Sequence, residues 1–259
     1  MNTYGKDVEM SLTFKDYFSN ISQSYRQYRP VYPKELFKWL SGISPRCETA
    51  LDCGCGTGQA SLGLAAYFQK VYAVDPSRAQ IANAVQDPKI TYLAVPAEAT
   101  GLPGRSSDLI VAAQSLHWFD IDRFYREVRR VASDGAVFSA VSYGLVTVND
   151  KIDELLLHLY YDVLAPYWPP ERKKVDDGYR SMSFPFREIA VPSFSMKAHW
   201  GLDRFLGYLS TWSAAEEMRS KRGIDILDMM DAELRYAWGN ASETKLLVWP
   251  LHLRVGIIE

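Results

Sequence analysis

The sequence predicts an α/β fold built on a doubly wound, mostly parallel sheet with helices on both faces. Between residues 50 and 141, short apolar runs alternate with segments of helical periodicity. Such alternation favours parallel pairing, because each helix returns the chain to the edge of the sheet where the next strand begins. The chain has 259 residues, of which 47% are hydrophobic, enough for one large domain with its own core.

The strands of this core are expected to be short and buried. Asp108 precedes the run Leu-Ile-Val-Ala-Ala, whose continuous apolar character is typical of a central parallel strand. Phe124, Val128 and Val131 recur at helical spacing, so one face of their helix should pack on the sheet. We predict strands at 50–53, 71–74, 90–94, 108–113 and 136–141, and helices at 58–69, 77–86 and 121–132.

Further helices are expected on either side of this core. Proline suits the first turn of a helix, so Pro33 predicts a helix that begins there and presents Leu36 and Leu40 on its apolar side. Residues 150–166 and 202–238 also have helical spacing, and the second of these segments is expected to break near a glycine at position 223.

The remaining segments complete the expected sheet and its cover. Residues 166–192 are rich in proline, charge and aromatic side chains, which predicts a long loop or lid. Segments 193–200 and 245–257 are expected as two more strands, the last one interrupted by Pro250. The expected layout is one domain, with a helical segment and cofactor-binding core at 1–145, a helical lid with the sixth strand at 146–242, and a final strand at 243–259.

A glycine turn follows the first core strand. The strand reaches Asp52, and Gly54, Gly56 and Gly58 then follow in the spacing G-x-G-x-G. Asp75 ends the next strand, 21 residues after the first of these glycines. A glycine turn lets the backbone approach a nucleoside, and an acid at the tip of the next strand can accept both ribose hydroxyls. The sequence therefore predicts a nucleoside-cofactor site.

The spacing also distinguishes between cofactors. A dinucleotide fingerprint has the spacing G-x-G-x-x-G, and its third glycine position falls here on Gln59. Asp52 lies next to the turn, where a carboxylate repels a pyrophosphate and attracts a cationic amino group. We therefore favour a phosphate-free, cationic cofactor and keep an NAD-dependent oxidoreductase as the alternative.

This turn, with Asp52 and Asp75, resembles the first motif of the class I S-adenosylmethionine-dependent methyltransferases. The resemblance implies a Rossmann-like sheet of seven strands, S-adenosylmethionine as methyl donor and S-adenosylhomocysteine as product. Three more segments are similar to the methyltransferase type 11 group, also called trans-aconitate methyltransferase-like. These are Tyr25-x-x-Tyr28-Arg29-Pro30-x-Tyr32-Pro33, Ser115–Phe119 and Tyr208–Ala214.

The resemblance implies a role for each matching residue. It places the turn glycines around the cofactor, Asp75 at the ribose hydroxyls, and Gln114 near the methionine moiety. Arg29 suits the cofactor carboxylate, because a guanidinium can bind a carboxylate with two hydrogen bonds. Asp52 either orients the turn through backbone amides or contacts the cofactor directly, and both roles stay open. The residues expected at the adenine are Ala97, through its amide, and Glu98.

Methyl transfer from a sulfonium is an in-line displacement, so the protein mainly positions the reactants, which can supply ~7–11 kcal/mol of the barrier. A carboxylate acceptor is already ionised at neutral pH and needs no general base, unlike a hydroxyl or an amine. His117 is the candidate base, and a structural role is its alternative. Candidate substrate contacts are Tyr25, Trp118, Tyr143 and Trp212, with Arg180 and Arg219 as further candidates for an anionic acceptor.

Composition limits the other partners. The net charge of −2 argues against a nucleic-acid surface, and no apolar run is long enough to span a membrane. Cys47, Cys53 and Cys55 are odd in number and lack metal-ligand spacing, so we expect neither a disulfide framework nor a metal site. We expect a cytoplasmic enzyme that methylates a small molecule, with an anionic acid as the class that the group's name suggests and with no protein partner. A non-catalytic protein that binds S-adenosylmethionine is the second alternative.

Overall fold

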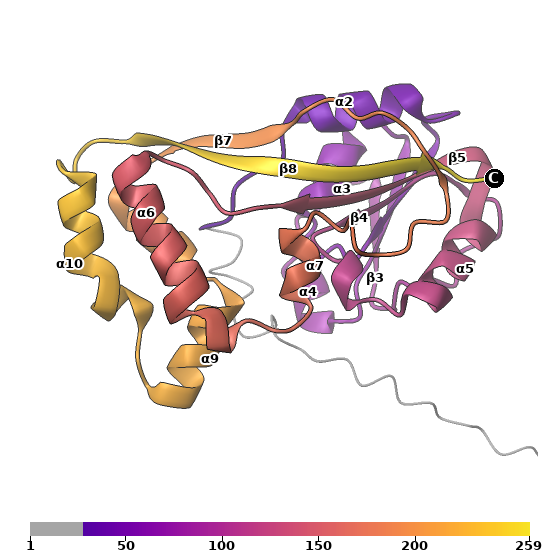
Figure 1. Ribbon diagram of the computed structural model, residues 1–259. Helices are drawn as coiled ribbons and strands as arrows, with labels where there is room; N and C mark the ends of the chain where they lie inside the picture. Colours follow the sequence, from indigo (N-terminus) through magenta and orange to yellow (C-terminus); the bar gives the residue numbers. More distant parts are fainter. Residues whose placement is uncertain (1–27) are drawn as a thin grey trace, which may run out of the picture.

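The computed structural model describes residues 28–259, which fold around one mixed sheet (Figure 1). Five strands are parallel neighbours, and the long β8 (Lys245–Ile257) adds to them in the antiparallel direction. The α/β class and the mostly parallel sheet are therefore confirmed. In spatial order the parallel strands are β3 (Ile90–Leu93), β2 (Lys70–Val74), β1 (Thr49–Cys53), β4 (Ser107–Ala113) and β5 (Ala132–Tyr143).

The sheet has eight strands, and the prediction of seven is wrong by one. The additional strand is β6 (Arg187–Glu188), which pairs with the end of β8 inside the segment expected to be a loop. Strand β6 is only two residues long, which is too short to show the alternating pattern by which a strand is predicted from sequence. The predicted strand near 193–200 is present as β7 (Ser195–Trp200) and pairs with the first half of β8.

Strand β8 is continuous, which corrects the interruption expected at Pro250. Proline removes only an amide donor, and Pro250 lies where β8 stops pairing with β7 and begins to pair with β5. Its carbonyl oxygen still accepts a hydrogen bond of 3.2 Å from the amide of Gly144. The missing amide donor of Pro250 therefore lies where β8 changes from pairing with β7 to pairing with β5, and the strand tolerates its loss there.

The sheet is buried on both faces by alternate residues of its strands. Leu109 and Val111 of β4 face one hydrophobic cluster, whereas Ile110 and Ala112 face the other. On the first face lie α2 (Lys34–Ile43) and α3 (Gln59–Ala65), and α5 (Ile121–Val131) covers the second. The alternation follows from the period of two along a strand, and it explains why the core strands are apolar throughout.

Two helices of the core begin at side chains that cap them. The Asp120 side chain accepts a hydrogen bond of 3.2 Å from the amide of Arg123 and so caps α5. Ser77 caps α4 (Arg78–Ala82) in the same way, at 3.3 Å from the amide of Gln80. Both α3 and α4 are shorter than their predicted ranges, because helical spacing alone does not mark where a helix ends.

A helical lid lies at one end of the sheet, beside the first half of β8 (Figure 1). The predicted break at position 223 is present, where Gly223 adopts a φ of 66° after α9 (Ser213–Arg222). The segment expected to be a loop contains the short helix α7 (Arg172–Asp176), which the sequence did not predict. The lid comprises α6 (Asp150–His158), η3 (Leu159–Val163), η4 (Ala165–Tyr167), α7 (Arg172–Asp176), α8 (Leu202–Ser210), α9 (Ser213–Arg222) and α10 (Ile226–Trp238).

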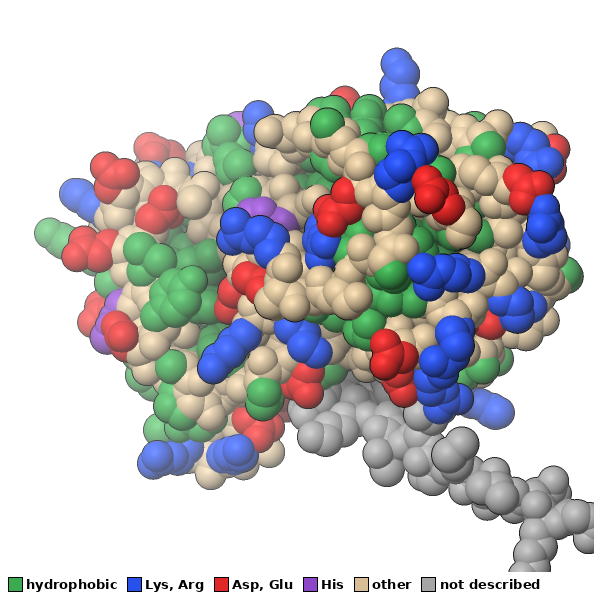
Figure 2. All heavy atoms as spheres, turned by 45° about the vertical axis from the view of Figure 1, so that its right-hand side comes forward, with side chains coloured by type: hydrophobic (Ala, Val, Ile, Leu, Met, Phe, Trp, Pro, Cys, Tyr) green, Lys and Arg blue, Asp and Glu red, His purple; other side chains and the backbone are tan. Residues whose placement is uncertain are grey.

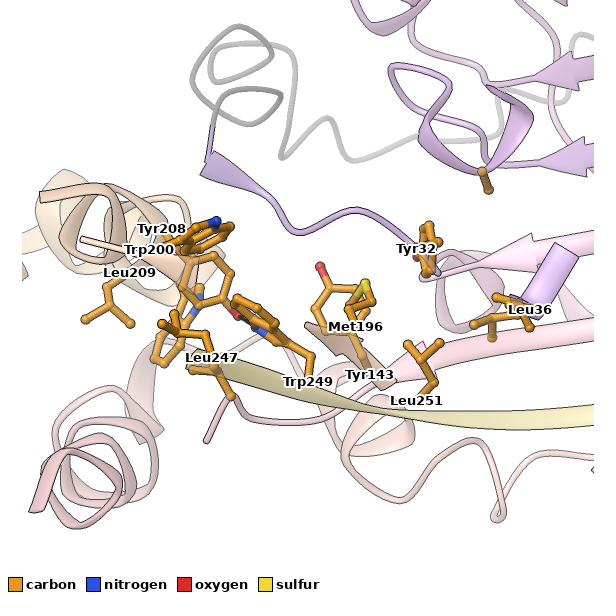
Figure 3. Close-up of a cluster of buried hydrophobic side chains, with 14 of the residues drawn as sticks. Tyr32, Leu36, Tyr143, Met196, Trp200, Tyr208, Leu209, Leu247, Trp249 and Leu251 are labelled. Carbon is orange, nitrogen blue, oxygen red and sulfur yellow. Dashed lines mark hydrogen bonds between the residues drawn. The ribbon is translucent and has the colours of Figure 1, made fainter. Parts of the chain in front are cut away.

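Aromatic packing joins this lid to the sheet (Figure 3). The ring of Trp249 on β8 lies 5.0 Å from that of Trp200 on β7 and 5.5 Å from that of Tyr208 on α8. The indole nitrogen of Trp249 also donates a hydrogen bond of 3.0 Å to the Tyr208 hydroxyl. Because Trp249 is fully buried, this contact fixes α8 against the strands.

The surface of the described chain shows no strong charge bias in the view of Figure 2, where acidic and basic side chains are interspersed. Within residues 28–259, no helix combines the length and the apolar composition that crossing a membrane requires.

We predict that Asp108 stabilises the base of the core. Its buried carboxylate accepts hydrogen bonds from the Ser133 hydroxyl, the Arg46 guanidinium and the amides of Glu48 and Thr49. Asp108→Ala would remove this buried acceptor, leave the buried Ser133 hydroxyl without it, and should lower the free energy of unfolding by about 2–3 kcal/mol. Urea unfolding at pH 7 measures this loss.

The matched control is Asp134→Ala, which removes an exposed carboxylate from the start of β5, next to Ser133. It should change the free energy of unfolding by less than about 0.5 kcal/mol. Equal losses in the two variants would show that the Asp108 network does not carry the stability assigned to it.

Candidate functional site

The glycine turn after β1 is held close to neighbouring loops. Gly54 has a φ of 68°, and a Cβ atom there would lie 2.5 Å from the Cβ of Ser115 in the loop after β4. Gly58 has a φ of 84°, and a Cβ there would lie 2.1 Å from the hydroxyl oxygen of Tyr92. Both positions require glycine for conformation and for space. The Ser115 hydroxyl donates a hydrogen bond of 2.6 Å to the carbonyl oxygen of Cys53, which ties the two loops together.

Asp75 connects the tips of β1 and β2. One carboxylate oxygen accepts a hydrogen bond of 2.9 Å from the amide of Gly56, and the other accepts one of 2.9 Å from the amide of Ser77. The side chain thus orders the glycine turn from the end of the neighbouring strand. A carboxylate can accept about four hydrogen bonds, and ribose hydroxyls are donors of the kind it accepts. The ribose role of Asp75 stays a prediction.

A cavity of about 480 Å³ opens at the carboxyl ends of the parallel strands. This is where ligands bind in open α/β sheets, and the volume falls in the range of small-molecule sites. Most of the residues predicted for the cofactor meet in its wall, but Gly58 and Arg29 do not. The predicted residues that line this larger cavity are Asp52, Gly54, Gly56, Asp75, Ala97, Glu98 and Gln114.

Glu98 is positioned by the loop after β4. Its carboxylate accepts a hydrogen bond of 2.9 Å from the amide of Asp120, whose side chain caps α5. Ala97 is buried beside it. Both residues therefore lie in the wall of the larger cavity, as the adenine role requires, and that role stays a prediction.

Asp52 is fully buried and lines the same cavity. One of its oxygens accepts a hydrogen bond of 2.6 Å from the Ser61 hydroxyl on α3, and the other has no partner among the described residues. Burial raises its pKa to about 7, although the hydrogen bond from Ser61 opposes that shift. The amide of Gly56 in the turn binds Asp75, and the turn-orienting role of Asp52 stays a prediction. Direct contact with the cofactor stays a prediction.

Gln114 marks the boundary of the cofactor site. It follows β4 with a φ of 55°, which is uncommon for a residue other than glycine. The nitrogen of its side-chain amide donates a hydrogen bond of 3.4 Å to the backbone carbonyl oxygen of Tyr143. The oxygen of the same amide is buried without a partner among the described residues. Asp52 and Gln114 thus both line the cavity, and each keeps one buried side-chain oxygen without a partner among the described residues.

A second, smaller cavity of about 60 Å³ adjoins the first. Gln114, Trp118 and Tyr143 line both cavities, so these residues form their shared wall. The lid supplies the far side of the smaller cavity, which no local sequence pattern predicts. Its other charged and aromatic lining residues are Arg29, His117, Tyr160, Trp168, Arg172, Tyr208 and Trp212.

The structure places Arg29 in the smaller cavity. Its guanidinium donates hydrogen bonds to the Tyr143 hydroxyl, at 3.1 Å, and to the carbonyl oxygen of Thr211, at 2.8 Å. It also lies over the ring of Tyr208, 5.4 Å from the centroid. Arg29 therefore bridges β5 and the lid beside the shared wall, and its contact with a cofactor carboxylate stays a prediction.

His117 also lines the smaller cavity, in the short helix η2 (Leu116–Trp118). Its Nδ1 atom lies 3.1 Å from the hydroxyl of the fully buried Tyr179. Burial lowers the pKa of His117 to about 3, and the positive charges of Arg172 and Lys174 add to the shift. A neutral imidazole with this pKa is a poor general base at neutral pH, so the geometry favours the structural alternative.

Of the other predicted substrate contacts, Trp118, Tyr143 and Trp212 line the smaller cavity. Tyr25 lies outside the described residues. Arg180 donates to the backbone of Asp177 and Arg219 pairs with Glu216, and both arginines are absent from the cavity wall.

Sequence reasoning missed Arg172, which the structure places in the smaller cavity. It is the first residue of α7 and follows two prolines and Glu171. Its guanidinium lies 5.4 Å from the ring centroid of Tyr160 and 5.1 Å from that of Trp168. The sequence showed only a short basic run from 172 to 174, which is also typical of a solvated surface.

No group of three or more His, Cys, Asp or Glu side chains among residues 28–259 has the arrangement of a metal site. The described cysteines are all free, and burial raises the pKa of Cys53 and of Cys55.

We predict that ionisation of Asp52 lowers the free energy of unfolding of the cofactor-free protein at high pH. Its pKa is raised from the ordinary value of 3.8 to about 7, so wild type loses stability as the pH rises between these values. Asp52→Asn cannot ionise and should be more stable than wild type at pH 8, by up to about 4 kcal/mol, with a gap that closes toward pH 4. Urea unfolding between pH 4 and 8 measures this gap. The exposed Asp122→Asn should show no such trend, and a pH-independent effect of Asp52→Asn would contradict the prediction.

Comparison with known proteins agrees with this site. A family model described as a methyltransferase domain matches residues 51–140. A protein of Dictyostelium discoideum assigned as a methyltransferase is 34% identical over 229 residues, 87% of this chain and 87% of that protein. The solved structure of a protein from Anaeromyxobacter dehalogenans, assigned as a type II methyltransferase, is 50% identical, with a TM-score of 0.84 over 89% of this chain and 98% of that chain. The chain therefore belongs to the class I S-adenosylmethionine-dependent methyltransferases.

Proposed function

We propose that this enzyme transfers a methyl group from S-adenosylmethionine, held in the larger cavity, to a small anionic acid held in the smaller one. The observation that carries the proposal is the wall that the two cavities share. Reactants bound on either side of Gln114, Trp118 and Tyr143 would meet there, as an in-line displacement requires. Membership of the methyltransferases removes the NAD-dependent oxidoreductase alternative.

The charges of the larger cavity suit the cofactor. Its described lining includes the acids Asp52, Asp75, Glu98, Asp120 and Glu171, and no Lys or Arg. Acidic side chains stabilise an ammonium and a sulfonium, and they disfavour a phosphate. When bound, the cofactor supplies the methyl group and a good leaving group. The protein contributes position and the exclusion of water, with Asp75 and the glycine turn at the nucleoside end.

The charges of the smaller cavity have the opposite sign. Arg29 and Arg172 line it, and its described lining contains no Asp or Glu. The aromatic side chains around them lower the local dielectric constant, which strengthens the attraction for an anion. His117 is neutral with a pKa of about 3, so no strong base lies in this wall. An acceptor that is already ionised at neutral pH, such as a carboxylate, needs none.

We predict that the enzyme methylates acids and spares their neutral counterparts. The protein would be incubated with S-adenosylmethionine labelled on the methyl group, a set of small carboxylic acids, and the matching amides. Label should pass to one or more acids and to no amide. Transfer to amides or alcohols alone would contradict an anionic acceptor. Binding of S-adenosylhomocysteine without transfer to any compound would favour the non-catalytic alternative.

Asp75→Asn should weaken the binding of S-adenosylhomocysteine by about 10- to 100-fold, because an amide offers one acceptor oxygen where the carboxylate offers two charged ones. Titration calorimetry measures the affinity. Asp122→Asn, at an exposed position on α5 outside the cavity wall, should bind like wild type. An unchanged affinity for Asp75→Asn would place the ribose elsewhere.

A further inference from the structure

We propose that Arg172 and His117 together bind the anionic group of the acceptor, with the guanidinium and the Nε2–H of a neutral imidazole donating to one carboxylate. This inference rests on the proposed function, which places the acceptor in the smaller cavity. It assigns His117 to recognition of the substrate and takes it out of the role of general base.

Arg172 is held with its terminal nitrogens available. Its Nε donates hydrogen bonds to the Tyr160 hydroxyl, at 2.5 Å, and to a carboxylate oxygen of Asp176, at 3.0 Å. Its two Nη atoms donate to no residue that the structure describes, although its side chain is only 21% exposed. The rings of Tyr160 and Trp168 lie against the guanidinium, and Trp168 is itself tied to the backbone of Tyr160 by a hydrogen bond of 3.1 Å. Because its Nε is fixed in this way, the guanidinium is preorganised to bind an anion through its two Nη atoms.

His117 faces the same cavity with one ring nitrogen occupied and the other available. The contact of 3.1 Å with the Tyr179 hydroxyl occupies Nδ1, and no described residue bonds to Nε2. Burial raises the pKa of Tyr179, and a backbone hydrogen bond from Leu116 opposes that shift, as a donor to the phenol oxygen does. The hydroxyl proton of Tyr179 is then free to donate to Nδ1. This assigns the ring proton to Nε2, which makes that atom a donor toward the cavity.

The charged groups around His117 keep it neutral. Arg172 and Lys174 of α7 both act on the ring, together with burial, and the neutral Tyr179 completes its surroundings. Burial, Arg172 and Lys174 all lower the pKa of His117 and so disfavour the imidazolium. The affinity for an anion should therefore not depend on protonation of His117 between pH 5.5 and 8.

The size and position of this pair limit the acceptor. A cavity of 60 Å³ has room for about four to six groups the size of a water molecule, which matches a small acid. Arg172 and His117 line only the smaller cavity, whereas the methyl group is delivered across the shared wall. A carboxylate whose lone pairs accept hydrogen bonds from a guanidinium is also a weak nucleophile. The acceptor therefore carries a second ionised group as its nucleophile, such as another carboxylate, which needs no general base and is distinct from the anion that Arg172 holds.

Binding of crotonate and of its neutral amide, crotonamide, to the protein saturated with S-adenosylhomocysteine tests this inference without turnover. Titration calorimetry should show that wild type prefers crotonate by about 10-fold or more. Arg172→Gln should abolish this preference, Arg172→Lys should retain part of it, and His117→Gln and Tyr179→Phe should each reduce it about 3- to 10-fold. The matched control is Arg180→Gln, which removes an exposed cation from the same segment and should leave the preference unchanged. Affinity for S-adenosylhomocysteine shows that each variant is folded.

Three results would overturn the inference. The first is an Arg172→Gln variant that binds crotonate with the same affinity as wild type while its affinity for S-adenosylhomocysteine is unchanged. The second is a wild-type protein that binds crotonate no better than crotonamide. The third is a crotonate affinity, or a kcat with a transferable acid, that titrates near pH 6–7 in wild type and not in His117→Gln, since this would identify a titrating base. Arg172-dependent binding of crotonate with no methyl transfer to any acid would support the anion site and count against the proposed function alone.

Discussion

The hydrogen bond from the Ser115 hydroxyl to the carbonyl oxygen of Cys53 sets the distance between the two loops that carry the chemistry. It holds the loop after β4 against the glycine turn after β1, and Gly54 lacks the Cβ that would force them apart. The residues of the shared wall depend on this contact, because Gln114 precedes Ser115 and Trp118 follows it by three positions. A looser junction would separate the cofactor from the acceptor, and positional errors of this kind are costly in displacement reactions.

The two cavities have opposite electrostatic character across that wall. Acids line the larger one, and one of them, Asp52, is buried deeply enough to raise its pKa to about 7. Arginines line the smaller one, where the same burial and the nearby cations lower the pKa of His117 to about 3. A cationic methyl donor on one side and an anionic acceptor on the other would each stabilise the charges that the protein holds there. The transfer would then bring opposite charges together and neutralise them.

In the proposed function, the lid would supply most of the contacts with the acceptor. Tyr160, Trp168 and Arg172 come from η3, the loop after η4 and α7, and their mutual contacts form a rigid aromatic and cationic wall. Tyr208 and Trp212 complete it from α8 and the residue that precedes α9, and Tyr208 is fixed in turn by Trp249 of the sheet. The specificity of the site therefore depends on packing between segments that are distant in the sequence, whereas the cofactor side is built from consecutive strand ends.

The sequence alone determined the alternating core, the glycine turn and the position of Asp75, because each of these follows from local spacing. The resemblance to class I methyltransferases, drawn from those motifs, is confirmed by the family of the chain. Only the tertiary structure showed that Arg29 lies in the smaller cavity, that Arg172 belongs to the site, and that burial keeps His117 neutral. It also revealed β6 and the passage of β8 through Pro250. The physical reason is the sequence distance over which the interactions act. A strand end and its turn are specified by neighbours along the chain. The charge state of a histidine and the partners of an arginine depend instead on the residues that the folded chain packs around them.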